Sequence, residues 1–230
     1  KGVVEIGETL TGLEPDLDEG VRRARAIRER LAGDIFKHLA EDLEGNGYSA
    51  DHSSPRFTHG LDIAAGRRQP YFQQPQSFYF PELPNIQFYP REAFDWVEDL
   101  EAATADITAE LTALLEDQSR FSPYMKSLAN VPNRADAALI DSMDWSACFL
   151  SQDGTITPDA QRCPLTIRAL NAAPLCRIAG RSPQIMFSQL KPGAHIAPHT
   201  GSVNTRLICH LPLIVPPGCK FRVGNEVREW

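Results

Sequence analysis

The chain has 230 residues, of which 42% are hydrophobic and 23% are charged, so it is long enough for one large globular domain or a small domain joined to a medium one. Its formal net charge of −7 argues against non-specific nucleic-acid binding, which depends on clustered Lys and Arg. No apolar run approaches the ~20 residues of a membrane-spanning helix. We therefore expect neither a nucleic-acid partner nor a membrane span.

The five cysteines form no CxxC pair, and their number is odd. This pattern disfavours both a structural zinc site and a simple disulfide framework. Cys163 and Cys176 flank a loop and could pair, although free thiols fit a reducing compartment better. Since no signal peptide is recognisable after Lys1, we expect a cytoplasmic protein.

The first predicted element is a long helix, in which apolar side chains recur every three or four residues from Val21 to Leu43. Its predicted end is the glycine-containing segment 44–47. A shorter helix is predicted over 57–65. We assign residues 1–74 to a helical N-terminal region, which could be the end of a helical repeat array. Its role is either to present a substrate or to cover the domain that follows.

Residues 70–90, PYFQQPQSFYFPELPNIQFYP, are rich in proline, glutamine and aromatic residues. The prolines preclude a regular helix, because each removes a backbone N–H and its ring clashes with the preceding turn. The aromatic residues indicate packing, so we expect an extended strap over the following domain. From Pro90, an amphipathic pattern predicts one long helix that ends near Ser119.

From Trp145 onwards, short apolar runs alternate with Gly and Pro turns. Such runs predict antiparallel strands in a sandwich or barrel. The predicted strands are WSACFL, QIMFSQL, HIAPH, RLICHLPLIV and KFRV. Helices precede strands along the chain, and the predicted fold class is α+β.

Half of the six histidines, His195, His199 and His210, lie close together in the segment 187–215. A turn at Pro192-Gly193 predicts that the first two begin a new strand and lie on one side of it. Non-haem iron oxygenases hold the metal with two histidines and often one carboxylate. These histidines are therefore candidate metal ligands, whereas the alternative for each is a core histidine that is satisfied by hydrogen bonds.

The strand predicted after Gly201 carries charge among apolar residues. A period of two places Arg206, Ile208 and His210 on one face, with Cys209 on the other. Burial of Arg and His is unfavourable unless both have partners. Because both can donate hydrogen bonds to a carboxylate, this face would suit a dicarboxylate beside a metal-binding histidine.

The run from Pro192 to Leu213 resembles the aspartyl/asparaginyl β-hydroxylase family, whose signature is similar to PGxHxxPHxGxxNxRLxxHLxL. Matched positions are Pro192, Gly193, His195, Pro198, His199, Gly201, Asn204, Arg206, Leu207, His210, Leu211 and Leu213. A looser resemblance reaches Trp230 and extends back through Asp144-Trp145-Ser146 to the strap. We assign residues 75–230 to an oxygenase domain of this type.

The resemblance implies a double-stranded β-helix (jelly-roll or cupin-like) core, ferrous iron as cofactor and 2-oxoglutarate as co-substrate. It implies that His199 binds the metal. Arg206 is interpreted as an anion-binding or structural residue, and both residues are assigned to the catalytic site. Contacts to the co-substrate are implied for Ser188, Ile208, Cys209 and His210, with Trp145 at the edge of the pocket.

Two departures bear on the metal site. Gly201 stands where many related oxygenases have a metal-binding aspartate, so iron would have two protein ligands rather than three. By the same resemblance, the second metal histidine and the arginine that binds the distal carboxylate are expected beyond Trp230.

The predicted function is hydroxylation of an aspartyl or asparaginyl C–H bond in a peptide, a protein or a small molecule. One alternative is a hydroxylase of a free amino acid or a lipid acyl chain. Another is a non-catalytic β-helix binding module that the N-terminal helices present. An Asp-Asp-x-x-x-His run after Trp230 would favour the enzyme, whereas a stop codon there would favour the binding module. The oligomeric state is not predicted.

Overall fold

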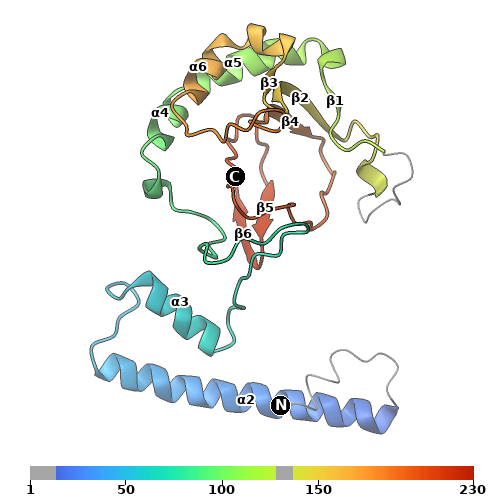
Figure 1. Cartoon of the computed structure of the whole chain (residues 1–230). Helices are drawn as coiled ribbons and strands as arrows, with labels where there is room; N and C mark the ends of the chain where they lie inside the picture. The colour runs from blue at the N-terminus through green and yellow to red at the C-terminus, as the bar shows by residue number, and fades with distance from the viewer. Residues whose placement is uncertain (1–13, 128–136) are drawn as a thin grey trace. The chain divides into compact units, whose positions relative to one another are not determined.

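The computed structural model describes residues 14–127 and 137–230. The chain divides into two compact units, Lys1–Tyr71 and Phe72–Trp230 (Figure 1). The first unit is helical in its described part, whereas the second combines helices with antiparallel strands. The predicted mixture of α and β structure, with helices at the N-terminal end, is thereby confirmed.

The first unit contains helices α2 (Pro15–Gly45) and α3 (Pro55–Ala64), and both predicted helices are confirmed. Each begins with a proline in its first turn, where the missing N–H has no intrahelical acceptor in any case. Tyr48 links the two helices, since its hydroxyl donates to Thr58 Oγ1 at 3.1 Å and its ring meets that of Phe57 edge-on.

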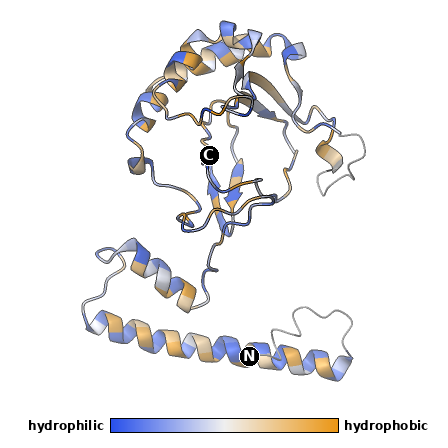
Figure 2. Ribbon diagram, viewed as in Figure 1, coloured by the Kyte–Doolittle hydropathy of each residue, from blue (hydrophilic) through white to orange (hydrophobic). Residues whose placement is uncertain are grey.

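The apolar stripe of α2 is mostly exposed. Figure 2 shows hydrophobic and hydrophilic residues alternating along this helix. Val21 is buried, but Leu31 is 50% exposed and Ile35 is 69% exposed. The sequence pattern was expected to mark a buried face, and that prediction is wrong for most of the stripe. Periodicity produces an amphipathic helix, but only a partner surface can bury its apolar side.

The second unit begins with the predicted strap. Residues 72–90 contain no helix and no regular strand, as expected from their prolines. A parallel bridge joins Phe78 to Val203, and the Gln87 side chain donates to the carbonyl of Val223 at 2.6 Å. The aromatic side chains of the strap are less buried than predicted, because Phe72 is 64% exposed and Phe78 is 56% exposed.

The long helix predicted after Pro90 is two helices. They are α4 (Val97–Ala102) and α5 (Thr104–Leu115), preceded by the 3₁₀ turn η1 (Arg91–Ala93). The Thr104 hydroxyl donates to the carbonyl of Glu101 at 2.6 Å, a local bond of the kind that competes with helical hydrogen bonding. The predicted apolar stripe still faces inward, because Leu100, Ile107 and Leu114 are all buried.

The larger of two antiparallel sheets in this unit has four strands. Its strands are β1 (Ser122–Pro123), β2 (Trp145–Gln152), β3 (Thr155–Ile156) and β4 (Ile185–Leu190). Strand β2 is central, with β4 on one edge and the short strands β1 and β3 on the other. A separate hairpin consists of β5 (Lys220–Val223) and β6 (Glu226–Glu229).

The remaining helical elements connect and cover this sheet. They are η2 (Gln118–Arg120), η3 (Ala137–Leu139), η4 (Pro158–Arg162) and α6 (Pro164–Leu170). Glu110 on α5 accepts hydrogen bonds from the backbone N–H groups of Leu165 and Thr166 at 2.8 Å each. This carboxylate caps the first turn of α6, where backbone N–H groups lack helical acceptors.

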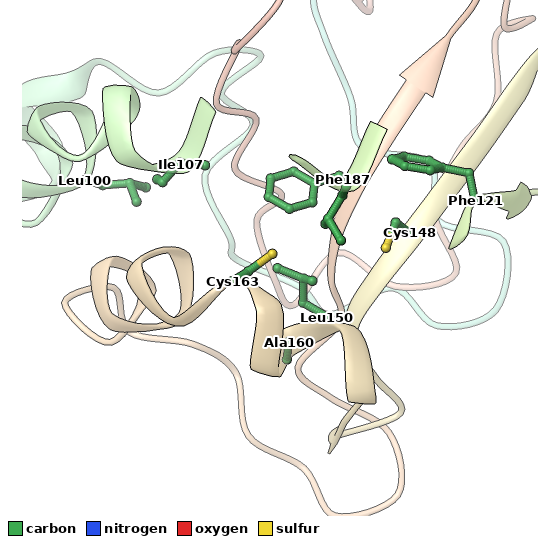
Figure 3. Close-up of a cluster of buried hydrophobic side chains, with 9 residues drawn as sticks. Leu100, Ile107, Phe121, Cys148, Leu150, Ala160, Cys163 and Phe187 are labelled. Atoms are coloured by element: carbon green, nitrogen blue, oxygen red, sulfur yellow. The ribbon is translucent and has the colours of Figure 1, made fainter. Parts of the chain in front are cut away.

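The core lies between the helices and the β2–β4 pair (Figure 3). It consists of Leu100, Ile107, Leu114, Phe121, Cys148, Leu150, Ala160, Cys163 and Phe187. Burial raises the pKa of the Cys148 thiol to about 11 and that of Cys163 to about 12, so both stay protonated. All five cysteines are free, and Cys163 does not pair with Cys176.

Three predicted strands are confirmed as β2, β4 and β5, but two others are wrong. Residues 195–199 and 206–215 have no strand structure. A strand requires a neighbouring backbone to satisfy its N–H and C=O groups, and alternation in the sequence does not supply one. The described strands form two separate sheets, and a double-stranded β-helix stays a prediction.

None of the described helices combines the length and apolar character of a membrane span.

Candidate functional site

Strands β2 and β4 bring two of the predicted site residues together. Trp145 pairs with Leu190 and Ala147 pairs with Ser188, so Trp145 and Ser188 are diagonal neighbours on one face. The indole Nε1 of Trp145 donates to Ser188 Oγ at 3.1 Å. The serine hydroxyl accepts in this bond, which leaves its own hydrogen for another acceptor.

His199 lies beside the same tryptophan. The centroids of the His199 and Trp145 rings are 6.4 Å apart, and the planes are tilted by 45°. His199 Nδ1 is 2.9 Å from the carbonyl oxygen of Ala197. Because a carbonyl can only accept, Nδ1 carries the hydrogen and Nε2 of the neutral ring has a free lone pair. This is the tautomer in which Nε2 can bind a metal.

Tyr124 completes this cluster and was not identified from the sequence. Its ring centroid is 4.3 Å from that of Trp145, and its backbone N–H donates to the Trp145 carbonyl at 2.9 Å. Tyr124 follows β1, which is only two residues long and has no alternating pattern. No sequence signal available for one chain would have associated it with Trp145.

A metal ion fits this cluster only in part. His199 offers one nitrogen, Nε2, because the hydrogen bond of Nδ1 fixes the tautomer of the ring. In residues 14–127 and 137–230, no three side chains of His, Cys, Asp or Glu are grouped so as to hold an ion. The described residues therefore offer one candidate metal ligand and not a complete coordination sphere.

His210 does not contact this cluster. Its ring lies 4.9 Å from the ring of Phe221 and 5.7 Å from that of Trp230, measured between centroids. His210 is exposed, yet the groups packed around its ring partly desolvate it and lower its pKa, which favours the neutral imidazole. The expected strand around His210 does not form, and the role of Ser188 and His210 as one wall that binds 2-oxoglutarate stays a prediction.

The segment that precedes His210 is irregular and open. Ile208 is 79% exposed and Leu207 is 53% exposed, although alternation had placed them on opposite faces. Cys209 and Arg206 are exposed as well. The predicted shared face of Arg206, Ile208 and His210 is therefore wrong. Further along, Leu211 and Leu213 do pack partly against the core.

Arg206 lines a small pocket between the strap and the segment 204–207. The pocket has a volume of about 120 Å³. Its lining consists of Gln73, Leu83, Pro84, Tyr89, Asn204, Thr205, Arg206 and Leu207. Arg206 is the only charged residue in that lining, and a guanidinium is a side chain suited to binding anionic groups.

Comparison with known proteins places these features in a family. A family model described as aspartyl/asparaginyl beta-hydroxylase matches residues 101–230. Aspartate beta-hydroxylase domain-containing protein 2 of Rattus norvegicus is 32% identical over 70% of this chain and 46% of its own length. The corresponding protein 1 of Bos taurus is 33% identical over 100% of this chain and 59% of its own length.

The aspartyl/asparaginyl beta-hydroxylase of Homo sapiens is 39% identical over 41% of this chain and 13% of its own length. No solved structure matches the chain. The chain spans less than two thirds of the length of these relatives. Since the family match covers more than half of its residues, the chain belongs to the aspartyl/asparaginyl β-hydroxylase family.

Proposed function

We propose that this protein is an Fe(II)- and 2-oxoglutarate-dependent dioxygenase that hydroxylates a C–H bond of an aspartyl or asparaginyl residue. Membership of a hydroxylase family supports the reaction type. The observation that carries the proposal is the grouping of Trp145, Ser188 and His199, in which His199 presents a metal-binding nitrogen. A double-stranded β-helix fold and a cytoplasmic location are part of the same proposal.

In this proposal, His199 supplies one iron ligand through Nε2. The hydrogen bond between Nδ1 and the Ala197 carbonyl holds the ring in the required tautomer and orientation. When bound, iron and 2-oxoglutarate would activate dioxygen, which is the oxidant, with 2-oxoglutarate converted to succinate and carbon dioxide, whereas the protein binds and orients the reactants. Trp145 lies beside His199, with its ring centroid 6.4 Å away, and would form one side of the site.

Ser188 is proposed to bind the co-substrate. Its oxygen already accepts a hydrogen bond from Trp145, so its hydroxyl hydrogen is directed away from the indole and can be donated to a carboxylate of 2-oxoglutarate. His210 is proposed as a second donor, with Ile208 and Cys209 beside it. The lowered pKa of His210 leaves one ring N–H for this purpose, because the neutral imidazole has a single donor.

Arg206 is proposed to bind an anionic group of a ligand in the pocket below the strap. A guanidinium can form two parallel hydrogen bonds to one carboxylate, which fixes the orientation of the ligand as well as its position. The aspartyl side chain of the substrate would satisfy this geometry, whereas the co-substrate is assigned to Ser188 and His210.

The test uses a protein that continues beyond Trp230 to the expected second metal histidine. It measures the formation of succinate from 2-oxoglutarate and dioxygen in the presence of Fe(II), ascorbate and a synthetic peptide with a central aspartate. His199→Ala is expected to abolish turnover and to leave the circular dichroism spectrum unchanged. His195→Ala is the matched control, because it removes a neighbouring exposed imidazole and should retain turnover. Turnover at the wild-type rate in His199→Ala would show that the metal assignment is wrong.

A further inference from the structure

The side chain of Asn204 joins two segments that lie far apart in the sequence. The backbone N–H of Phe80 donates to Asn204 Oδ1 at 2.7 Å. In return, Asn204 Nδ2 donates to the Phe80 carbonyl and to Gln73 Oε1, at 2.9 Å each. Both N–H groups and the oxygen of the amide are thus engaged with the strap.

The backbone next to this contact is paired as well. The N–H groups of Gln76 and Ser77 donate to the carbonyls of Gly201 and Ser202, at 2.9 Å each. The strap residues therefore run alongside the segment 201–204, which begins two residues after His199. Any displacement of the strap removes the partners of this segment.

Apolar burial alone does not hold the strap here. Tyr79 is 50% exposed and Phe80 is 47% exposed, so these rings recover only part of the free energy of full burial. The reciprocal bonds of Asn204 supply a specific attachment at this point. At its other end the strap is attached separately, through Gln87 to Val223 and Asn225 of the β5–β6 hairpin.

We propose that Asn204 is a positioning residue that holds the strap as one wall of the Arg206 pocket. The strap contributes Gln73, Leu83 and Tyr89 to that pocket, and Arg206 lies on the opposite side. Because the polar atoms of Asn204 are occupied by the strap, it acts on the ligand through the strap. The inference rests on the proposed function only for the identity of the ligand, an aspartyl peptide.

The attachment is tested by amide hydrogen exchange on the 230-residue chain, which requires no turnover. Asn204→Ala should accelerate exchange at Gln76, Ser77 and Phe80 by about tenfold or more, since local opening becomes less costly. Gln73→Ala removes a single bond to Asn204 and should have a smaller effect. The matched control is Gln87→Ala, which loosens the other end and should leave these amides unchanged.

Unchanged exchange in Asn204→Ala would overturn the proposal, and so would equal acceleration in Gln87→Ala. Exchange within β2 and β4 serves as the internal reference. If exchange within β2 and β4 accelerates as much as exchange within the strap, the variant has lost global stability rather than a local attachment. The positioning role is then rejected.

The role in binding is tested by steady-state kinetics in a preparation that turns over 2-oxoglutarate. Asn204→Ala should raise KM for the aspartyl peptide by about tenfold and leave KM for 2-oxoglutarate within about twofold. A purely structural residue would lower the melting temperature and kcat without separating the two KM values. If a wild-type protein that continues beyond Trp230 to the expected second metal histidine shows no turnover, the proposed function fails, and hydrogen exchange on the 230-residue chain still decides the role of Asn204.

Discussion

The β2–β4 pair and the segment 195–215 contribute to the candidate site in opposite ways. Strand β2 is mostly buried, and its partner β4 brings Ser188 to Trp145 through a register that is regular from Trp145 to Phe149. The segment 195–215 contains most of the family signature, yet it has no strand structure and exposes Ile208. The region with the clearest motif is therefore the less regular of the two.

This contrast separates a scaffold, the β2–β4 pair, from the segment that carries the candidate metal ligand. The packed strands fix Trp145, and Trp145 in turn lies against His199 from the irregular segment. A rigid scaffold that positions residues on loops is a common arrangement for binding and catalysis. Substitutions in the two regions should consequently differ in what they impair: stability in the first and ligand binding in the second.

The largest expected effect comes from the core beneath β2. Leu150 is 1% exposed, so Leu150→Ala leaves a cavity and should lower the free energy of unfolding by about 2–5 kcal/mol. Ile208→Ala is the control from the irregular segment, where 79% exposure predicts a change within about 0.5 kcal/mol. Urea unfolding measures both. Similar losses in the two variants would remove the distinction between the regions.

The second prediction concerns the binding of 2-oxoglutarate beside the β2–β4 pair. Ser188→Ala should raise KM for 2-oxoglutarate about ten- to a hundredfold, because a hydrogen bond to a charged group contributes about 1.5–3 kcal/mol. His210→Ala should behave similarly if both residues contact the co-substrate. Iron affinity should change far less in either variant. If His210→Ala weakens iron and 2-oxoglutarate equally, His210 is a metal ligand instead.

The third prediction compares two glycines with similar backbone angles. Gly154 has φ +78° in the β2–β3 turn, and an added Cβ would lie 2.8 Å from the Ser182 carbonyl oxygen. Gly193 has φ +80° before His195, and a Cβ there would meet nothing within 4 Å. Both alanine variants incur the cost of a positive φ, about 1 kcal/mol, but only Gly154→Ala adds a steric clash.

Thermal unfolding should therefore show a clearly lower melting temperature for Gly154→Ala than for Gly193→Ala. Equal melting temperatures would mean that the turn next to Ser182 is as adaptable as the turn before His195.

The smallest expected effect is a pH dependence from His210. Its folded-state pKa lies below the ordinary value of 6.5, so the unfolded chain binds a proton more readily. Stability is therefore greatest above pH 6.5 and falls as the pH drops through the unfolded pKa towards the folded one. His210→Gln should flatten this dependence between pH 7.5 and 5.5 in thermal unfolding. An unchanged slope would assign the dependence to other groups.

Several elements could be predicted because their signal is local. The three- and four-residue spacing from Val21 to Leu43 produced helix α2, since helical hydrogen bonds connect residues within one turn. The run that begins at Trp145 became β2. The family could also be identified from one run of residues around His199, because its signature depends only on the order of residues along the chain.

Other features depended on contacts between distant residues. Trp145 and Ser188 are 43 positions apart and Asn204 and Phe80 are 124 apart, and no periodicity encodes such pairs. The same limitation explains the wrong strand at 206–210, where alternation was present but a backbone partner was not. Amino-acid order alone determined helices α2 and α3, strands β2, β4 and β5, and the family. Tertiary structure decided which segments found hydrogen-bonding partners. Those partners lie far apart in the sequence, and they meet only when folding closes the long loop between them.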